Sequence, residues 1–370
     1  MSPKHLVVLG ATGSIGQSAA KVARDIPERV RLVGLSAHRN PSGLAELARE
    51  FPEAALCLTD EACAASFPAE LRPQGRFFEG EEGLLALATL PEAEMVLIAI
   101  VGTGGLRPAL AAIEAGKDLA IASKEILVMA GGIVMEAARK KGVRVLPVDS
   151  EHNAIFQCLE GRPAESVSRL ILTASGGPFR QTPAEELAAV TREQALKHPT
   201  WSMGAKITID SATLFNKGLE MIEARWLFDV PMERVEVVVH PQSIVHSMVE
   251  FVDGSVLAQL SRSDMCFPIQ YAVTWPERVP NTLRPLDFST LRRLEFEPPR
   301  YEVFPALTLA RQAGDAGGTL PAVLNAANEV AVDAFLNGRL SFPGIWETVA
   351  ATLEAHVPVA RPDLDAIVGA

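Results

Sequence analysis

Two carboxylates stand at the end of a strand-like apolar run, Val143–Asp149. Asp149 and Glu151 are two residues apart, so in an extended segment both side chains would point to the same side. Paired carboxylates suit a hard divalent cation such as Mg²⁺ or Mn²⁺. An ordinary acidic loop explains this spacing equally well, so the metal site is a hypothesis that needs a third ligand.

Glu220 is the candidate for that third carboxylate. The segment from residue 209 to residue 220 is predicted to be a helix whose cap lies at residue 210 or 211. Asn216 and Glu220 are four residues apart and share one helix face, with Lys217 alongside. An amide, an ammonium and a carboxylate together could hold a phosphate or polyol and a metal. The alternative is a surface ion pair between Lys217 and Glu220.

Two loops are candidate substrate binders. In Thr173–Pro178 a hydroxyl is followed by two glycines, a pattern that could expose backbone N–H groups to an anion. In His198–Gly204 the large aromatic Trp201 lies on a loop bounded by proline and glycine, which fits a lid that excludes water. Docking of Trp201 into a nearby core is the alternative. His240 and His246 are more often structural than catalytic in such a pattern.

A glycine-rich segment, Gly10–Gly16 with the sequence GATGSIG, follows a strand and opens a helix. Glycines allow a tight turn and let the backbone approach a pyrophosphate, and the helix N-terminus attracts the negative charge. The spacing is a variant of the dinucleotide fingerprint. A glycine-rich turn without a ligand is therefore the alternative.

The residues that follow the second predicted strand, Val30–Ala37, favour NADP(H) over NAD(H) as the cofactor. A site for NAD(H) would place an acidic residue there, but the sequence continues with His38, Arg39 and Asn40. Arg39 can meet a 2′-phosphate, so the sequence predicts NADP(H). The alternative is that these side chains form a solvated loop.

Three later strand ends also carry unusual residues. These are the platform Gly102–Gly105, the segment Ala122–Glu125 and the segment Asp149–Asn153. In an open parallel sheet, ligands bind beyond the carboxyl ends of the strands. The three segments are therefore expected to converge on the ligand.

The order of elements predicts the fold. Strand-like runs alternate with helical segments over the first 150 residues, which predicts a parallel sheet covered on both faces. Strand pairs follow, with a hairpin at Asp253-Gly254, and then a proline-rich passage and a helical tail. The predicted class is α/β, with a Rossmann-like NADP-binding domain, a central α+β catalytic domain and a C-terminal helical bundle. The predicted ranges are 1–150, 151–280 with a mobile loop, a linker at 281–303, and 304–370.

Composition excludes several classes of protein. The 370 residues carry a formal net charge of −11, which disfavours sequence-independent binding to nucleic acid. The longest apolar run, Met95–Val101, is far too short for a membrane helix, and no secretory signal is apparent. Four scattered cysteines form no CxxC pair, which predicts inert thiols in a cytoplasmic protein.

Longer motifs then carry a resemblance over essentially the whole chain. They are GATGSIG (10–16), HRN (38–40), ASKE (122–125), PVDSEHNAIFQ (147–157), TASGGPFR (173–180), HPTWSMGAKITIDSATLFNKGLEMIEARWLF (198–228), HPQSIVHSMVEF (240–251), DGSVLAQL (253–260) and LNAANEVAV (324–332). With these motifs the chain closely resembles the 1-deoxy-D-xylulose 5-phosphate reductoisomerase family.

This resemblance implies the NADPH-dependent rearrangement and reduction of 1-deoxy-D-xylulose 5-phosphate to 2-C-methyl-D-erythritol 4-phosphate, in the non-mevalonate isoprenoid pathway. It implies a homodimer and a divalent metal, Mg²⁺, Mn²⁺ or Co²⁺. The implied metal ligands are Asp149, Glu151 and Glu220. The implied catalytic group adds Lys124 and Trp201 to these three. The implied substrate contacts are Lys124, Ser150, Glu151, Ser175, His198, Ser211, Asn216, Lys217 and Glu220. The implied cofactor contacts are Thr12, Gly13, Ser14, Ile15, His38, Arg39, Asn40, Ser123, Glu125 and Gly204.

Three positions depart from the family pattern. Ser123 stands where the family usually has Asn, Ile126 where it has Ser or Thr, and Ala205 where a basic residue is common. Ser123 can still form a hydrogen bond to nicotinamide or ribose, but with less reach. These departures bear on cofactor affinity more than on the reaction.

Two other functions fit part of the sequence. One is a different NADP-dependent dehydrogenase of a small phosphorylated or acidic substrate, whose carboxylates are structural and whose activity would survive EDTA. The other is a non-enzymatic redox sensor that binds NADPH and a protein partner. The sensor gives no reason for three carboxylates at one ligand edge.

Overall fold

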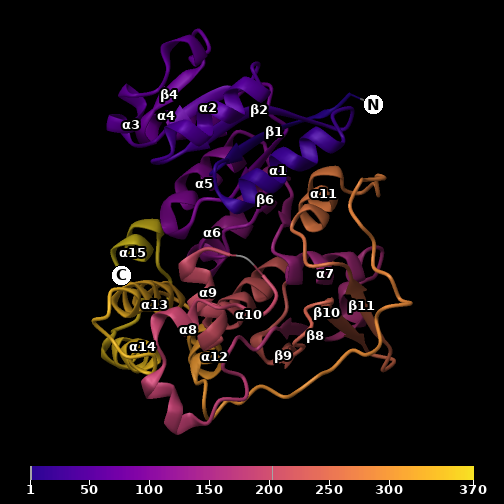
Figure 1. Ribbon diagram of the computed structural model, residues 1–370, viewed down its shortest axis with the longest axis vertical. Coiled ribbons are helices and arrows are strands. Elements are labelled where there is room, and N and C mark those ends of the chain that lie inside the picture. The colour runs from indigo at the N-terminus through magenta and orange to yellow at the C-terminus, as the bar shows by residue number, and fades with distance from the viewer. Residues whose placement is uncertain (1, 202) are drawn as a thin grey trace. The chain divides into compact units, whose positions relative to one another are not determined.

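The computed structural model describes residues 2–201 and 203–370, and the chain divides into two compact units (Figure 1). Unit 1 comprises Met1–Ile126, Val134–Asn153 and Asp264–Arg284. Unit 2 comprises Leu127–Ile133, Ala154–Ser263 and Pro285–Ala370. These bounds differ from the predicted ranges in two places: residues 264–284 pack in unit 1, and residues 304–370 belong to unit 2 instead of forming a domain of their own. Composition does not reveal which elements pack together.

Unit 1 is built on a seven-stranded parallel sheet with the order β4-β3-β2-β1-β5-β6-β7. Most of its strands are buried along nearly their whole length, as the near-continuous apolar runs predicted. The strands are β1 (Lys4–Leu9), β2 (Val30–Ala37), β3 (Ala55–Leu58), β4 (Phe77–Glu79), β5 (Met95–Ile98), β6 (Asp118–Ile121) and β7 (Val145–Pro147).

The helices of unit 1 follow from the strand order. The sheet grows in one direction through β1, β2 and β3 and in the other through β5, β6 and β7, so right-handed crossovers place helices on both faces. Helix α1 packs against α11, and α4 packs against α5. The helices are α1 (Ser14–Asp25), α2 (Pro41–Glu50), α3 (Glu61–Ala65), α4 (Gly80–Ala88), α5 (Leu106–Glu114), α6 (Glu125–Lys141), whose middle belongs to unit 2, and α11 (Cys266–Thr274).

Unit 2 contains a second, mixed sheet with the order β11-β10-β8-β9. Strands β8 and β9 are parallel, whereas β10 is antiparallel to both β8 and β11. The predicted hairpin at Asp253-Gly254 is confirmed, because it joins β10 to β11 and Gly254 has a φ of 82°. The strands are β8 (Val167–Ala174), β9 (Val235–Val239), β10 (Val245–Phe251) and β11 (Val256–Leu260).

The parallel pair β8 and β9 requires a long crossover, and that crossover carries most of the predicted substrate residues. It contains α8 (Arg192–Ala195), α9 (Ala205–Thr213) and α10 (Phe215–Phe228). The helix predicted for residues 209 to 220 is therefore wrong as a single element. Leu214 has a φ of 66° and separates α9 from α10, so residues 210 and 211 lie inside α9 rather than at a cap.

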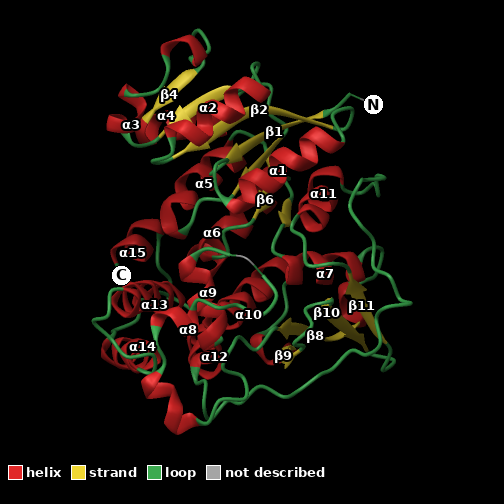
Figure 2. Cartoon of the chain, in the orientation of Figure 1, coloured by secondary structure: helices red, strands yellow, loops and turns green. Residues whose placement is uncertain are grey.

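The C-terminal part of unit 2 is helical, as predicted. A core of large aromatic side chains forms where Phe342 contacts Phe179, Phe335 and Trp346. The helices are α12 (Ala306–Ala316), α13 (Leu320–Leu336), α14 (Gly344–Ala355) and α15 (Leu364–Gly369). Figure 2 shows the proline-rich passage before α12 as an irregular stretch, in which Glu297 alone forms a β-bridge, with Val239. The predicted α/β class, with a second mixed sheet and C-terminal helices, is confirmed.

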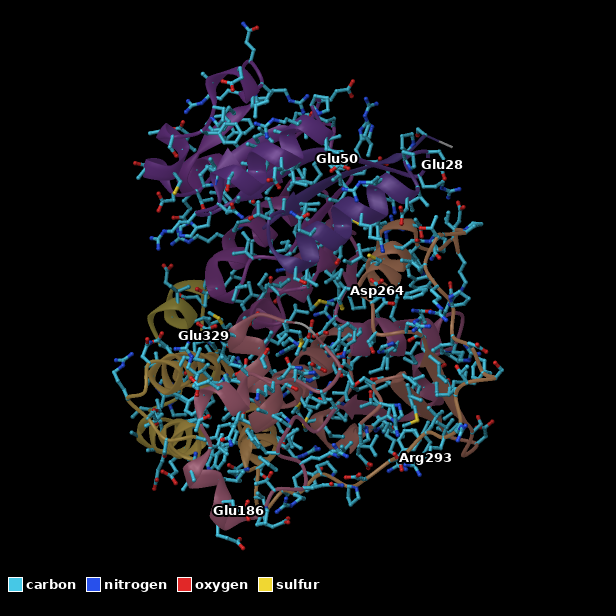
Figure 3. All side chains as sticks on the ribbon, viewed as in Figure 1. Glu28, Glu50, Glu186, Asp264, Arg293 and Glu329 are labelled. Carbon is cyan, nitrogen blue, oxygen red and sulfur yellow. The ribbon has the colours of Figure 1, made fainter. Side chains whose placement is uncertain are left out.

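The surface of both units carries acidic side chains. Glu28 and Glu50 in unit 1 and Glu186 in unit 2 are exposed (Figure 3). Among the described residues, no helix is long and apolar enough to cross a membrane. All four cysteines are free thiols, and burial raises the pKa of Cys57 and of Cys266 to about 12.

Candidate active site

The glycine-rich loop between β1 and α1 has a geometry that only glycine allows at two positions. Gly10 has a φ of +88°, and a Cβ there would lie 2.5 Å from the carbonyl oxygen of Ala99. A Cβ at Gly16 would lie 2.4 Å from the backbone of Ala11, so the close packing of α1 on the loop needs a glycine. Gly13 has no such restriction, and α1 begins there without a side-chain cap. The first-turn N–H groups of α1 can therefore face an anion.

The predicted cofactor residues around this loop are accessible in unit 1. Gly13 and Ser14 are exposed, and Thr12 and Ile15 are partly buried. Asn40 caps α2, since its Oδ1 accepts a hydrogen bond from the Gly43 N–H at 2.9 Å. That capping bond leaves the amide nitrogen of Asn40 as the group available to a ribose or phosphate.

Arg39 lies at the end of β2 and has a partner that sequence reasoning missed. Its Nε donates to Oδ2 of Asp60 at 2.9 Å, while Oδ1 of Asp60 accepts from the Cys63 N–H at 3.0 Å. These bonds hold the pKa of Asp60 at about 2, so the carboxylate is ionised at neutral pH. His38 contacts the Thr59 hydroxyl at 2.9 Å. Asp60 could have been found from its position as a helix cap before α3.

Ser123 and Ile126 lie where the strand β6 leads into α6. The hydroxyl of Ser123 donates to the carbonyl oxygen of Ile100 at 2.5 Å and is almost fully buried. Ile126 is fully buried and would lie 2.8 Å from a Cβ placed on Gly105. Glu125 is buried in the first turn of α6. Ser123 therefore ties its own strand end to the loop that follows β5.

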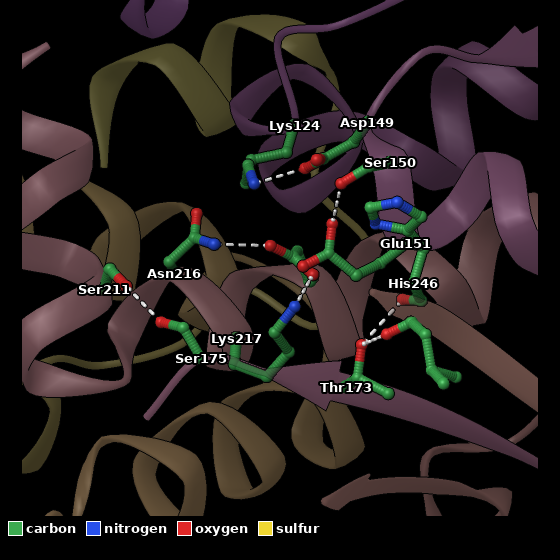
Figure 4. A network of polar contacts seen from close by, with 12 residues as sticks. Lys124, Asp149, Ser150, Glu151, Thr173, Ser175, Ser211, Asn216, Lys217 and His246 are labelled. Carbon is green, nitrogen blue, oxygen red and sulfur yellow. Dashed lines mark hydrogen bonds and ion pairs between the residues drawn. The ribbon is translucent and has the colours of Figure 1, made fainter. Parts of the chain in front are cut away.

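Asp149, Glu151 and Lys124 form a polar cluster in unit 1. Lys124 donates to Asp149, and the Ser150 hydroxyl donates to Glu151 at 2.6 Å (Figure 4). Carboxylate oxygens of Asp149 and Glu151 lie within 4.8 Å of each other. The segment does not stay extended, because α7 (Ser150–Leu159) begins here and the Asp149 carbonyl accepts from the Asn153 N–H at 2.8 Å. The first turn of this helix, rather than a strand, brings the two carboxylates together.

Glu220 lies in unit 2 with both neighbours that the sequence predicted. The Asn216 amide donates to Oε1 of Glu220 at 2.5 Å, and the Lys217 ammonium donates to Oε2 (Figure 4). The side chains of Lys217 and Glu220 are only 3% and 0% exposed. The alternative of a surface ion pair is therefore wrong. A buried carboxylate oriented by two donors is a well-formed ligand for a cation.

Ser175, His198 and Ser211 form a second polar cluster in unit 2. Nε2 of His198 lies 3.0 Å from each of the two hydroxyl oxygens, and these lie 3.3 Å from each other. The Gly177 N–H also donates to Oγ of Ser175 at 3.2 Å. Gly177 has a φ of +66°, and a Cβ there would lie 2.8 Å from the backbone of Ala212. Of the two glycines predicted to expose backbone groups, Gly177 thus lets this loop lie against α9.

The loop from His198 to Gly204 contacts the segment that follows β9. The Thr200 hydroxyl lies 3.2 Å from the Ser243 hydroxyl, and the rings of Trp201 and His246 are 6.3 Å apart. Trp201 is partly buried, and Gly204 is exposed at the start of α9. Position 202 of this loop lies outside the described residues.

Sequence reasoning treated residue 210 only as a cap, but Asp210 is a buried anchor for α9. Its carboxylate accepts from the Asn328 amide at 2.8 Å and from the Lys206 ammonium at 2.9 Å. Asp210 and Asn328 are 1% and 0% exposed. The i,i+4 spacing of Lys206 and Asp210 was the available signal. This contact ties α9, which carries Ser211, to α13 of the C-terminal helices.

Comparison with known proteins agrees with this fold. Three family models match the chain: 1-deoxy-D-xylulose 5-phosphate reductoisomerase over residues 6–131, the C-terminal domain of that enzyme over 145–228, and the DXP reductoisomerase C-terminal domain over 260–370. Relatives with the first of these names come from Symbiobacterium thermophilum, at 54% identity over 99% of this chain and 96% of the relative, and from Gloeobacter violaceus, at 50% identity over 99% and 94%.

Solved structures give the same result. The reductoisomerase from Zymomonas mobilis in complex with NADPH has a TM-score of 0.92 at 44% identity and covers 100% of this chain and 96% of that one. A DOX-P reductoisomerase in complex with NADPH, fosmidomycin and magnesium has a TM-score of 0.90 at 42% identity over 95% and 89%.

The α/β fold with its glycine-rich loop and acidic clusters is that of a dinucleotide-dependent oxidoreductase. More narrowly, the chain belongs to the 1-deoxy-D-xylulose 5-phosphate reductoisomerase family. The prediction of an NADPH-dependent enzyme of this family is thereby confirmed, and the two other candidate functions are set aside.

Proposed function

We propose that the residues of these polar clusters carry out the reaction of the reductoisomerase family. The reaction is the NADPH- and metal-dependent conversion of 1-deoxy-D-xylulose 5-phosphate to 2-C-methyl-D-erythritol 4-phosphate. The observation that carries the assignment to these residues is the buried Glu220, oriented by Asn216 and Lys217. In a neighbouring structure of the family, NADPH, fosmidomycin and magnesium bind together.

Asp149, Glu151 and Glu220 are the proposed metal ligands. Three carboxylates are the oxygen-rich donor set that Mg²⁺ or Mn²⁺ prefers. When bound, the metal supplies a Lewis acid for the carbonyl and adjacent hydroxyl of the substrate. Hydrogen bonds from Ser150 and Lys124 hold the first two carboxylates in orientation.

The substrate phosphate is assigned to the hydroxyls of Ser175 and Ser211, to His198, and to Asn216 and Lys217. The first three already form one hydrogen-bonded group. Binding energy at the phosphate, remote from the reacting carbons, can hold the loop closed. Trp201 then covers the substrate and keeps water from the aldehyde intermediate.

NADPH is assigned to the loop between β1 and α1 and to the neighbouring strand ends of unit 1. The uncapped start of α1 would receive the pyrophosphate, and Gly102–Gly105 would adjoin the nicotinamide, which supplies the hydride for the aldehyde. The proposed contacts are Thr12, Gly13, Ser14, Ile15, His38, Arg39, Asn40, Ser123, Glu125 and Gly204.

We also propose a cytoplasmic homodimer. β11 is an edge strand of its sheet, yet Val256 and Leu257 on it are 46% and 36% exposed. An uncovered apolar edge strand favours pairing with a second copy of the chain. Light scattering of the purified protein is expected to give twice the chain mass, and a monomer at micromolar concentration would contradict the proposal.

The test of the proposed function is NADPH oxidation with 1-deoxy-D-xylulose 5-phosphate in the presence of Mg²⁺ or Mn²⁺. Turnover is expected to stop on addition of EDTA and to return with excess metal. A folded preparation that binds NADPH but gives no turnover would defeat the assignment. Activity that survives EDTA would show that the carboxylates are structural.

Arg39→Ala is expected to weaken NADPH binding about tenfold, which is roughly one charge-assisted hydrogen bond, while leaving the weaker binding of NADH unchanged. Nicotinamide fluorescence measures both affinities. Arg31→Ala is the matched control, because Arg31 on β2 is likewise an exposed arginine paired with an acidic side chain, Glu53. An equal loss for the two cofactors would remove Arg39 from the 2′-phosphate site.

A further inference from the structure

We infer that His198 enters the phosphate subsite as a neutral imidazole with its proton on Nε2, and that Thr200 is the residue that holds it in this form. The inference rests on the proposed function, because it concerns how the subsite of Ser175 and Ser211 recognises the substrate phosphate. It adds a positioning residue, Thr200, that does not itself belong to the proposed contacts.

The state of His198 follows from the partners of Nδ1. The backbone N–H of Trp201 points to Nδ1 at 2.9 Å, and that of Thr200 at 3.2 Å. A backbone amide can only donate, so Nδ1 must present its lone pair. A neutral imidazole then carries its proton on Nε2. An imidazolium would need a proton on Nδ1 and would lose both amide hydrogen bonds.

The Nε2 proton sets the direction of the two hydroxyl groups. Nε2–H donates toward Oγ of Ser175 and Oγ of Ser211, each 3.0 Å away. Oγ of Ser175 also accepts from the Gly177 N–H. Because the hydroxyl oxygens accept these bonds, neither hydroxyl proton is used on His198. The two hydroxyls also share one hydrogen bond across 3.3 Å, so at least one of their protons is left to be donated to a phosphate oxygen.

Thr200 fixes the backbone that makes this arrangement. Its hydroxyl lies 3.2 Å from that of Ser243, which is only 9% exposed and has a φ of 51°. Ser243 is itself held, because its N–H donates to the His240 carbonyl at 3.1 Å and its carbonyl accepts from the Ser263 hydroxyl at 3.0 Å. The Thr200 side chain thereby attaches the His198 loop to a fixed point beyond β9.

The first test reads the tautomer directly in the full-length protein. Long-range ¹H–¹⁵N correlation spectra of ¹⁵N-histidine protein distinguish the two neutral forms and the imidazolium, and a His198→Asn spectrum assigns the signal. The Nε2–H form is expected at neutral pH, both without ligand and with NADPH, Mg²⁺ and the substrate analogue fosmidomycin. An Nδ1–H form or an imidazolium in either sample would overturn the inference.

The second test compares two amide replacements of His198. The side-chain nitrogen of glutamine reaches about as far as Nε2, whereas that of asparagine reaches only as far as Nδ1. His198→Gln is therefore expected to keep a KM for 1-deoxy-D-xylulose 5-phosphate several-fold lower than His198→Asn does. Equal KM values for the two variants would contradict a donor at Nε2.

The third test concerns Thr200. Thr200→Val keeps the shape and removes the hydroxyl, and it is expected to raise the KM for 1-deoxy-D-xylulose 5-phosphate about fivefold, the size of one net hydrogen bond. kcat and NADPH affinity should change less than twofold. Ser243→Ala should give the same shift, and the double variant no further loss, because both remove one contact. Thr352→Val is the control, since that hydroxyl donates to the Thr348 carbonyl within α14.

The outcomes separate this inference from the proposed function. If the wild-type protein, supplied with metal and NADPH, does not turn over 1-deoxy-D-xylulose 5-phosphate, the proposed function fails. If it turns over, and Thr200→Val leaves the KM and the His198 spectrum unchanged, the inference about Thr200 fails while the proposed function stands.

Discussion

Glu220→Gln is expected to lower metal-dependent turnover by at least about 100-fold, while the protein still folds and binds NADPH. Glutamine has the same shape as glutamate and can still accept from Asn216 or Lys217, but it offers the metal no charge. Changes to groups that merely orient a metal ligand typically cost 10- to 100-fold, so loss of the proposed ligand itself should cost at least the upper figure. Turnover measured against Mg²⁺ concentration, together with NADPH fluorescence, checks this result.

The same substitution should lower stability only moderately. Lys217 is buried and loses its ionic partner, but it keeps an oxygen acceptor at the same place. We expect a loss of about 1–3 kcal/mol, less than a deletion such as Glu220→Ala would cause. Glu236→Gln is the control, because its carboxylate pairs with Arg169 on the exposed side of the unit 2 sheet. Unchanged activity and metal dependence in Glu220→Gln would remove Glu220 from the metal site.

Gly10→Ala is expected to destabilise the protein by about 2–4 kcal/mol and to abolish NADPH binding. The new methyl group would lie 2.5 Å from the Ala99 carbonyl oxygen, and the backbone has a φ of +88° that alanine rarely adopts. Both costs arise without any ligand. Thermal unfolding of the cofactor-free protein should therefore detect the loss, and nicotinamide fluorescence should detect the binding defect.

Gly13→Ala is the matched comparison on the same loop. Gly13 has a φ of −80°, and its Cβ would make an ordinary contact of 3.4 Å with the Gly10 carbonyl. We expect unchanged thermal unfolding but NADPH binding weakened about tenfold, since the methyl group would lie where we propose that the pyrophosphate approaches the helix. If the two variants lose stability equally, the loop geometry described here is not what Gly10 maintains.

Much of unit 1 could be predicted because its strands are buried on both faces and are therefore apolar throughout. An apolar run followed by glycines was enough to predict β1, the glycine-rich loop and α1. β3 and β4 were missed, because runs of four and three residues are too short for periodicity to separate them from helix or loop. Because β3 was not predicted, Asp60, which follows it and pairs with Arg39, was not predicted either.

In the site, residue types were easier to predict than local geometry. Leu214 adopts a left-handed conformation between α9 and α10, and no glycine or proline marks the break. The burial of Lys217 and Glu220 arises from tertiary packing, which no local pattern contains. Likewise, only the folded chain shows that the Thr200 and Trp201 amides converge on one nitrogen of His198.

Helix α11 belongs to unit 1 but lies late in the sequence, and this has a consequence for folding during synthesis. Asp264 pairs with Lys21 of α1, and the Asn153 amide donates to the Pro268 carbonyl, although about 110 residues of unit 2 separate these segments. A ribosome that has released residues 1–153 has therefore supplied the whole parallel sheet but not the helix that covers α1. While the ribosome synthesises residues 154–263, the apolar surface that α11 later covers stays exposed on the nascent sheet. We expect binding of a chaperone to matter most during this interval. For the same reason, a fragment ending at residue 153 should aggregate, whereas a genetic fusion that appends residues 264–284 to it should be more soluble.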